Sequence, residues 1–257
     1  MNREKNVNEV TVRAIGGPTT VIDYAGRRYV VDPTFDGPGS YRNGPVTATK
    51  LAGPVATPEE LGPVDVVLVS HDHHIDNFDV SGRAYTRQAP RVFTTAAGAA
   101  RLGSPATGLR PFEHAEVGDA RVTAVPALHG SPEVGLGNGP VVGFVLEAEG
   151  RPTVYISGDN ASLDVVAVVA ERFPAIEVAV LNVGAAKIAV RGDVFLTLTA
   201  DLAARAAALL GARAVVPAHQ DGWAHLTQGA DDVVRAFAEA GLPGVLVDLR
   251  PGDSATF

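Results

Sequence analysis

The sequence predicts an α/β protein in which two mixed β-sheets pack together and helices cover their outer faces. Two observations support this prediction. Short runs rich in β-branched and aromatic residues, separated by Gly/Pro-type turns, dominate the first third of the 257 residues, and in the second half such runs alternate with helical patterns. Because the chain has no clear linker and no short repeat, we expect one domain over residues 1–257.

The first half of the chain is predicted to be mostly strand. We expect strands at residues 9–15, 19–25, 27–33, 64–70 and 91–95. A Gly/Pro-rich loop is predicted for residues 37–54. The segment from Thr57 to Glu60 has a capping-box pattern with proline at the first helical position, so a short helix should begin there. An alanine-rich helix should follow near residues 95–102.

The second half of the chain alternates between the two kinds of element. Strands are predicted at residues 120–127, 141–148, 152–158, 177–183, 213–218 and 244–249. Helices are predicted at residues 162–173, 199–211 and 230–241. Gly211 is a typical residue for the end of a helix.

Composition excludes several kinds of protein. The formal net charge of −8 argues against a nucleic-acid or anionic-membrane surface, because a polyanion would be repelled. The lack of cysteine excludes disulfides, thiolate metal ligands and a cysteine nucleophile. A polar N-terminal segment and the lack of a long apolar run predict neither a signal peptide nor an integral membrane segment, so we expect a cytoplasmic protein.

Four of the predicted strands are each followed by a histidine or an aspartate. These residues are His71, His129, Asp159 and His219. Because strands of a layered α/β structure can end at one edge, we expect the four side chains to converge. His73 adds a second imidazole to His71, since residues i and i+2 point the same way in an extended segment. Imidazole with carboxylate suits zinc, manganese or iron, so we predict a centre for one or two divalent ions, with zinc favoured.

Four segments resemble the motifs of the metallo-β-lactamase fold. SHDHHIDNFD (residues 70–79) resembles its His-x-His-x-Asp-His motif, and VPALHG (125–130) resembles its third-histidine motif. YISGDN (155–160) resembles its bridging-aspartate motif, and VVPAHQDGWAH (215–225) resembles its last-histidine motif. Residues 16–36 are similar to the opening strands of the branch that includes ascorbate-6-phosphate lactonase and the phospholipase-D-type acyl-ethanolamine hydrolases.

The resemblance implies a four-layer αββα sandwich with a metal site at one edge of the two sheets. The residues that it implies are His71, His73 and His129 for a three-histidine site, Asp159 as the bridging carboxylate, and Asp76 and His219 for a second site.

The chain departs from the family motif after His73. An extra residue separates His73 from Asp76, and Asn77 stands where the motif has its last histidine. Asparagine is a far poorer ligand for zinc, so the second site is expected to be weak, empty, or completed by His74 or Asp79. Whether one ion or two bind stays open at this point.

The predicted centre suits hydrolysis. A divalent ion with an open position lowers the pKa of bound water from about 15.7 to about 7, which supplies hydroxide at neutral pH, and it polarises a carbonyl or phosphoryl oxygen. We expect hydrolysis of an ester, lactone, amide or phosphodiester bond. Asp76 is the candidate to orient the water or take its proton, unless it binds metal, and Asp159 is the candidate to hold or bridge the ions.

Several other residues are candidates for supporting roles. Asp32 follows an early strand and is a candidate to hydrogen-bond a ligand histidine, with a turn-forming Asp-Pro as the equal alternative. Trp223, His225 and Asp221 are candidates for contacts to substrate. Lys187 and Arg191 are candidates to recognise an anionic group on the substrate, with a solvated surface role as the favoured alternative. His114 lies outside every motif and is expected to be structural or exposed.

Two other function classes stay open. One is a redox enzyme on the same fold with a single iron ion, and the other is a non-catalytic metal-binding or sensing protein. A serine hydrolase is disfavoured, because the chain has no Gly-x-Ser-x-Gly elbow. We expect a small-molecule substrate, and a homo-oligomer stays open.

Overall fold

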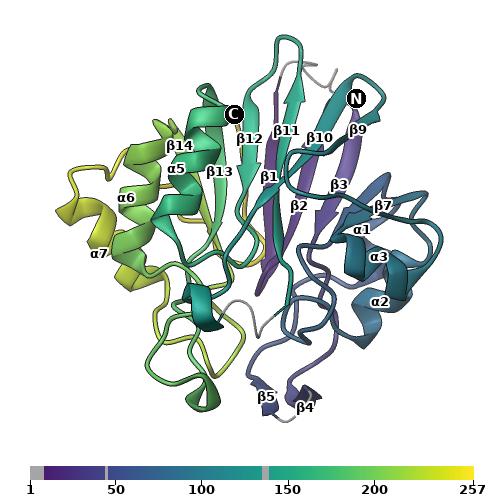
Figure 1. The fold of residues 1–257 in the computed structure, drawn as a ribbon, viewed down its shortest axis with the longest axis horizontal. Helices are drawn as coiled ribbons and strands as arrows, with labels where there is room; N and C mark the ends of the chain where they lie inside the picture. Colours follow the sequence, from purple (N-terminus) through teal and green to yellow (C-terminus); the bar gives the residue numbers. More distant parts are fainter. Residues whose placement is uncertain (1–8, 44–45, 135–138) are drawn as a thin grey trace.

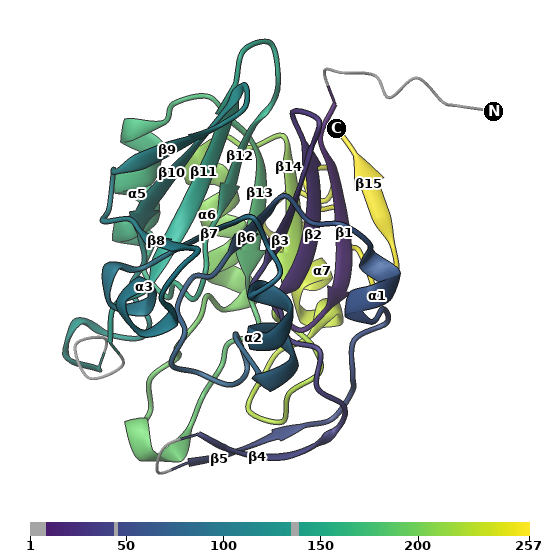
Figure 2. The same cartoon turned by 90° about the vertical axis from the view of Figure 1, so that its right-hand side faces the viewer.

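The computed structural model describes residues 9–43, 46–134 and 139–257. It confirms the predicted architecture, because two mixed sheets lie face to face and helices cover both outer faces (Figure 1, Figure 2). The layers therefore follow the order helix, sheet, sheet, helix.

The first sheet has seven strands and mixes antiparallel with parallel pairs. In spatial order they are β15 (Ser254–Thr256), β1 (Thr11–Gly16), β2 (Thr19–Tyr24), β3 (Arg27–Val31), β6 (Val66–Leu68), β7 (Arg91–Thr94) and β8 (Ala106–Gly108). Pairs from β15 to β3 are antiparallel, and pairs from β3 to β8 are parallel. Val31 lies opposite Leu68, so β3 and β6 end side by side.

The second sheet has six strands. In spatial order they are β14 (Ala214–Ala218), β13 (Ile176–Asn182), β12 (Thr153–Ile156), β11 (Val142–Ala148), β10 (Ala120–Pro126) and β9 (His114–Val117). The three strands from β14 to β12 are parallel, and the remaining pairs are antiparallel. Asn182 pairs with Ala218, so β13 and β14 also end at one level.

Helices cover the two sheets separately (Figure 1). The first sheet carries α1 (Pro58–Leu61), α2 (Val80–Thr86) and α3 (Ala96–Leu102), and the second carries α5 (Leu163–Arg172), α6 (Ala200–Leu210) and α7 (Ala230–Glu239). The predicted capping box is confirmed, since Thr57 accepts a hydrogen bond from the Glu60 amide and Glu60 bonds back to the Thr57 amide.

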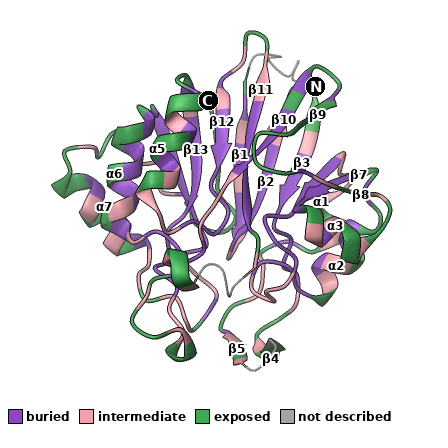
Figure 3. Ribbon diagram, in the orientation of Figure 1, coloured by how far each residue is buried: buried purple, intermediate pink, exposed green. Residues whose placement is uncertain are grey.

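Three apolar clusters hold the layers together. The largest lies between the sheets, where Leu68 of the first sheet shares a core with Phe144 and Ile156 of the second. Alternation along β10 divides its side chains, because Val122 belongs to that core and Val125 packs with the helix-side cluster. Figure 3 shows strands that are largely buried and helices exposed on their outer faces. Each fully buried Val, Leu, Ile or Phe side chain contributes about 1.5–3 kcal/mol.

The prediction of a last strand at residues 244–249 is wrong. This segment lies against the edge strand β14, but only Leu246 forms a bridge, with Val215. Its apolar residues Val245 and Leu246 pack against the helix-side core, so they are partly buried without belonging to a paired strand. The last strand is β15, which pairs with β1.

The predicted loop at residues 37–54 contains a hairpin of β4 (Gly39–Asn43) and β5 (Val46–Lys50). Its strands are short and carry few large apolar residues, and the Gly/Pro-rich residues around them favour a loop. The hairpin lies apart from both sheets, at the lower edge of the molecule in Figure 1. Within the described ranges, no helix has the length and apolar character needed to cross a bilayer.

Candidate metal centre

The predicted metal-binding residues meet at the edge of the sheets that faces the β4–β5 hairpin (Figure 1). They follow strands of both sheets: His71 comes after β6, His129 after β10, Asp159 after β12 and His219 after β14. A pocket of about 390 Å³ opens at this edge. Its polar lining consists mainly of His74, Asp76, His129 and His225, together with Thr47, Thr49 and Lys187.

His71, His74 and His129 form the first of two groups of candidate ligands. Nε2 of His71 lies 3.0 Å from Nδ1 of His74, and the ring centre of His129 lies 5.4 Å and 5.1 Å from those of His71 and His74. Nδ1 of His129 donates a hydrogen bond to the Leu196 carbonyl at 2.7 Å, and Nδ1 of His71 lies 2.9 Å from the Ser70 hydroxyl. Such bonds orient the rings and leave Nε2 of His71 and of His129 as candidate ligand atoms.

His73 lies next to the first group, with its ring centre 4.9 Å from that of His71 and 4.4 Å from that of His74. Its side chain is 24 % exposed, and Nδ1 lies 4.0 Å from a carboxylate oxygen of Asp72. Ligand atoms of His71, His73 and His74 all lie within 4.8 Å of one another. His74 therefore joins the three-histidine region rather than the second site, and it is His74 that lines the pocket beside His129.

Asp76, His219 and His225 form the second group of ligands. Their ligand atoms all lie within 4.8 Å of one another. Nε2 of His225 donates a hydrogen bond to Oδ2 of Asp76 at 2.9 Å, and Nε2 of His219 lies 3.7 Å from the same oxygen. His225 is predicted from the sequence as a substrate contact; the structure places it in the pocket lining and also against Asp76.

Asp159 lies between the two groups. Its Oδ1 accepts hydrogen bonds from Nδ1 of His219 at 3.1 Å and from Nδ2 of Asn182 at 2.8 Å. Its Oδ2 lies 3.6 Å from Nδ1 of His129 and 4.0 Å from Nε2 of His71. Among the described residues Oδ2 is buried with no hydrogen-bond partner. One carboxylate oxygen thus faces each group.

The protonation states of the two groups differ. Burial lowers the pKa of His71 well below its ordinary value and lowers that of His74 to about 4, so both imidazoles are neutral near pH 7. Burial alone would also lower the pKa of His219, but the carboxylates of Asp159 and Asp76 raise it to about 9. Burial alone would raise the pKa of Asp159, yet His219 and the other histidines hold it well below its usual range.

These donors fit a divalent ion. Buried polar atoms normally have hydrogen-bond partners, yet Oδ2 of Asp159 and Nε2 of His219 have none within the described ranges. Both atoms are of the kind that ligates zinc, manganese or iron, and the neutral imidazoles of His71 and His74 have the lone pairs that ligation requires. A bound cation would supply the missing partners.

Asp32 supports the site in a different way from the one predicted. Its carboxylate accepts a hydrogen bond from the Ser70 amide at 2.6 Å, so it holds the end of β6 rather than a ligand histidine. Burial raises its pKa to about 7. Gly158 brings β12 close to the same point, because its φ is +55° and an added Cβ would lie 2.9 Å from Cβ of Ser70.

Asp79 does not join the ligands. Its Oδ1 accepts a hydrogen bond from the Gly82 amide as the N-cap of α2, and its Oδ2 accepts one from the Asp36 amide at 2.7 Å. Nζ of Lys50 lies 3.3 Å from the same Oδ2. Asn77 does reach the site, since its Nδ2 donates to Oδ1 of Asp159 at 3.3 Å.

The other substrate-contact candidates are placed as follows. Trp223 is 2 % exposed and lies beneath His225, with 6.0 Å between ring centres. Lys187 lines the pocket but forms an ion pair with Asp193. Asp221 accepts a hydrogen bond from the Gly17 amide at 2.8 Å. Arg191 ends the short 3₁₀ helix η1 (Ala189–Arg191) near the pocket wall.

Sequence reasoning missed two residues that shape the site. Asn182 ends β13 and holds Asp159, and Asp72 forms an ion pair with Arg101 in the loop that carries His71 and His73. Asp72 is 2 % exposed, although it lies in a motif position with no ligand role. The position of Asn182 after an apolar strand was a usable signal, but asparagine was not counted among the ligand types.

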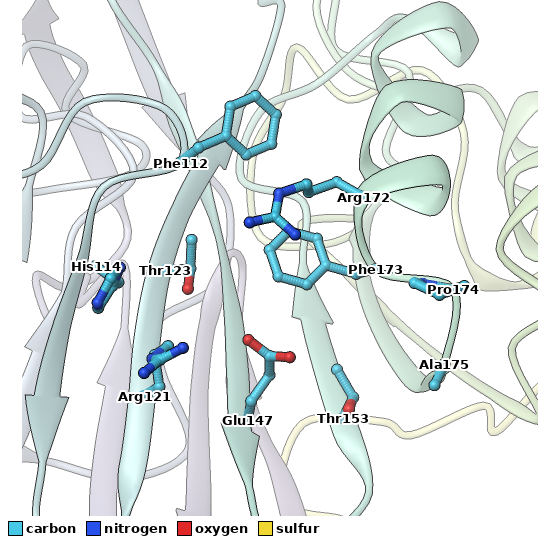
Figure 4. Close-up of a pocket in the computed structure, with 10 residues that line it drawn as sticks. All are labelled: Phe112, His114, Arg121, Thr123, Glu147, Thr153, Arg172, Phe173, Pro174 and Ala175. Atoms are coloured by element: carbon cyan, nitrogen blue, oxygen red, sulfur yellow. The ribbon is translucent and has the colours of Figure 1, made fainter.

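A second pocket of about 220 Å³ lies on the outer face of the second sheet, near the C-terminal end of α5 (Figure 4). It contains His114, whose side chain is 48 % exposed and lies 3.9 Å from Glu116. Arg121 in the same pocket forms an ion pair with Glu116 at 2.9 Å. His114 is therefore exposed, as predicted, and lies away from the metal-binding residues.

Comparisons with known proteins agree with this fold. Residues 27–220 match the family model described as the beta-lactamase superfamily domain. A UPF0173 metal-dependent hydrolase from Methanosphaerula palustris is 31 % identical over 183 residues, which cover 68 % of this chain and 75 % of that protein.

Two solved structures have the same fold. The isothiocyanate hydrolase from Delia radicum gut bacteria gives a TM-score of 0.81 at 22 % identity and covers 96 % of this chain and 98 % of its own. A Veillonella parvula protein described as a possible metal-dependent hydrolase gives a TM-score of 0.83 at 19 % identity and covers 98 % of this chain and 100 % of its own.

Proposed function

The chain belongs to the metallo-β-lactamase superfamily and to its UPF0173 metal-dependent hydrolases, and from this premise we propose that it cleaves an ester, lactone, amide or phosphodiester bond of a small molecule. The observation that carries the proposal is the position of Asp159. It offers one carboxylate oxygen to each of two histidine-containing groups, and the pocket opens directly onto both. Such an arrangement suits a hydrolytic metal centre with one ion or two.

The first group and Asp159 would hold an ion. Zinc is the ion to test first, and manganese and iron suit the same donors. When bound, such an ion lowers the pKa of a coordinated water to about 7 and polarises a carbonyl or phosphoryl oxygen. His129 is held for this role by the Leu196 carbonyl, and His71 by Ser70.

Asp76 is proposed to orient the attacking water. Its carboxylate lines the pocket, and the hydrogen bond from His225 fixes Oδ2 there. That hydrogen bond holds the pKa of Asp76 below its ordinary value against the effect of burial, so the group is ionised at neutral pH. An ionised carboxylate can accept a proton from water or ligate an ion, and the carboxylate of Asp76 would do either at the pocket wall.

The walls of the pocket favour a small substrate with an apolar part. Val46 and Ala48 of the hairpin face Ile188 and Leu196 across it. The positive charge of Lys187 is matched by Asp193, so we do not assign it to an anionic substrate group. The similarity of residues 16–36 to lactonases and phosphodiesterases of the superfamily supports including both bond types in a screen. We also propose a cytoplasmic location.

The test is a hydrolysis screen of the metal-loaded protein and of the same protein after chelation. The panel holds esters, lactones, amides, phosphodiesters and an isothiocyanate, the last because of the structural similarity to an isothiocyanate hydrolase. Turnover should require metal and should be lost in Asp159→Asn and His129→Ala, with His114→Ala as the matched control. If both site variants keep their metal and their turnover, the proposal fails.

Two other outcomes of the screen would favour a different function. One equivalent of iron with oxygen uptake would favour a redox enzyme on this fold. Bound metal without turnover across the whole panel would favour a metal-binding or sensing protein.

A further inference from the structure

Asp76, His219 and His225 are placed to bind an ion of their own. We infer that they hold a second divalent ion, and that His225 supplies the ligand which Asn77 cannot provide. The inference rests on the proposed metal-dependent function and extends it from one ion to two. It concerns a residue far along the chain from the motif that it completes, since 149 residues separate His225 from Asp76.

The distances match a shared ion. An ion with bonds of about 2.1 Å and tetrahedral angles keeps its donor atoms roughly 3.4 Å apart. Oδ2 of Asp76 lies 2.9 Å from Nε2 of His225 and 3.7 Å from Nε2 of His219, which bracket that separation. The ligand atoms of all three side chains lie within 4.8 Å of one another, so one ion can be reached by all three donors after small side-chain shifts.

A simple Asp76–His225 hydrogen bond does not account for the whole group. Nε2 of His219 is buried and has no hydrogen-bond partner among the described residues, although it lies beside the same carboxylate oxygen. Its other nitrogen, Nδ1, donates to Asp159, which fixes the ring so that Nε2 faces Asp76. An ion between Asp76, His219 and His225 satisfies this nitrogen, and the hydrogen bond alone leaves it unsatisfied.

The loop that carries His225 is held in place. The carbonyl of His225 accepts a hydrogen bond from the Lys187 amide at 2.9 Å, and the Ala224 amide donates to Thr49 of the hairpin at 3.0 Å. The buried Trp223 packs beneath the His225 ring, and Nζ of Lys50 lies 5.3 Å from the Trp223 ring centre. His225 is therefore a positioned side chain, which an ion ligand needs to be.

Asn77 stands where the family motif has a histidine, and His225 compensates for that missing ligand. Its side chain reaches the bridging carboxylate, because Nδ2 lies 3.3 Å from Oδ1 of Asp159. An amide nitrogen has no lone pair for a metal, and an amide oxygen is a poor partner for zinc. The substitution of the motif histidine thus removes one ligand on one side of the site, and His225 provides an imidazole from the other side.

The experiment measures zinc stoichiometry and affinity by chelator competition and elemental analysis, on the full chain. The wild-type protein should bind two equivalents. His225→Ala should keep the first and bind the second at least about 100-fold more weakly. The double variant Asn77→His with His225→Ala should regain the second equivalent, and the matched control His114→Ala should behave as wild type. Thermal unfolding of each metal-free variant reports folding separately.

Two results would overturn the inference. In one, His225→Ala still binds two equivalents with wild-type affinity. In the other, wild type and variant both bind a single equivalent, in which case the proposed hydrolase survives with one ion. Binding of no metal by the wild type would instead remove the proposed function itself, so the two failures are distinguishable.

Discussion

The two ligand groups differ in how the fold builds them. In the first, His71 and His129 directly follow β6 and β10 and are 0 % and 4 % exposed. In the second, Asp76 and His225 come from loops, and their side chains are 13 % and 14 % exposed. His71 and His74 of the first group are neutral near pH 7, whereas the second group combines the carboxylate of Asp76 with a protonated His219. His219 of the second group also follows a strand, β14, so the difference teaches that the second group depends on contacts between distant loops in addition to the sheet.

Removing Asp159 should have the largest effect, because its carboxylate serves both groups. Asp159→Asn should lower kcat/KM at least about 1,000-fold, which corresponds to roughly 4 kcal/mol of transition-state stabilisation. Metal content should fall together with activity. The exposed Asp164 of α5 gives the matched control, Asp164→Asn. Unchanged metal binding in Asp159→Asn would show that the two groups do not share this carboxylate.

The first group can be tested by separating two neighbouring histidines. His74→Ala should weaken binding of the first zinc ion about 100-fold, because His74 lies against His129 and lines the pocket. His73→Ala should weaken it less than about tenfold, since of the two histidines it is His74 that lines the pocket. Competition titration with a zinc chelator measures both. If His73→Ala lost more zinc affinity than His74→Ala, the ligand would be His73, the residue that the family motif implies.

The pH dependence should also distinguish the groups. The pKa of His219, about 9, lies above the ordinary value of 6.5, so a cation must displace its proton at neutral pH. Affinity for the second ion should rise about tenfold per pH unit up to pH 9. The first ion should show little change above pH 6, because His74 has a pKa of about 4. Zinc titrations between pH 6 and pH 9 measure this, and equal slopes for both ions would contradict it.

The raised pKa of His219 also affects the stability of the metal-free protein, which should decrease as pH rises, whereas affinity for the second ion should increase. A raised pKa stabilises the folded state fully below the unfolded value and loses that contribution as pH rises through the folded value. His219 should therefore stabilise the metal-free protein below about pH 6.5, and this stabilisation should disappear as pH approaches 9. Denaturant unfolding of the chelated protein at several pH values measures it.

The smallest effect is expected for Arg101, which pairs with Asp72 in the loop that carries His71 and His73. Nε of Arg101 donates to Oδ2 of Asp72 at 2.7 Å in the ligand loop, and the arginine side chain is 50 % exposed. Arg101→Ala should cost less than about 1 kcal/mol of stability and weaken zinc binding less than about tenfold. Arg121→Ala, which breaks an ion pair at the other pocket, is the control. If Arg121→Ala weakened zinc binding as much as Arg101→Ala does, Arg101 would have no positioning role in the ligand loop.

Local patterns predicted the parts of the fold that depend on local sequence. Residues 64–70 and 120–127 are apolar runs, and the strands β6 and β10 lie inside them. The ligands at their ends could be predicted for the same reason. The segment 244–249 has a similar pattern, but a helix-side core buries it without strand pairing. Helix α2 was not predicted, because its sequence has Ser, Gly and Thr and begins only at the Asp79 cap.

Long-range pairing was not visible in the sequence. The contact of His225 with Asp76 depends on the hairpin, Trp223 and the segment after β13, none of which leaves a local signal. The position of His74 depends on how one extra residue is accommodated in a tight loop. Asp79 shows the converse, since a ligand type in a motif position caps a helix instead.

The most direct test of the central claim is elemental analysis of the purified protein after reconstitution, as moles of each transition metal per chain. The structure predicts two equivalents of zinc or manganese, one for each ligand group. A protein that stays free of metal after reconstitution with zinc, manganese and iron would contradict the claim.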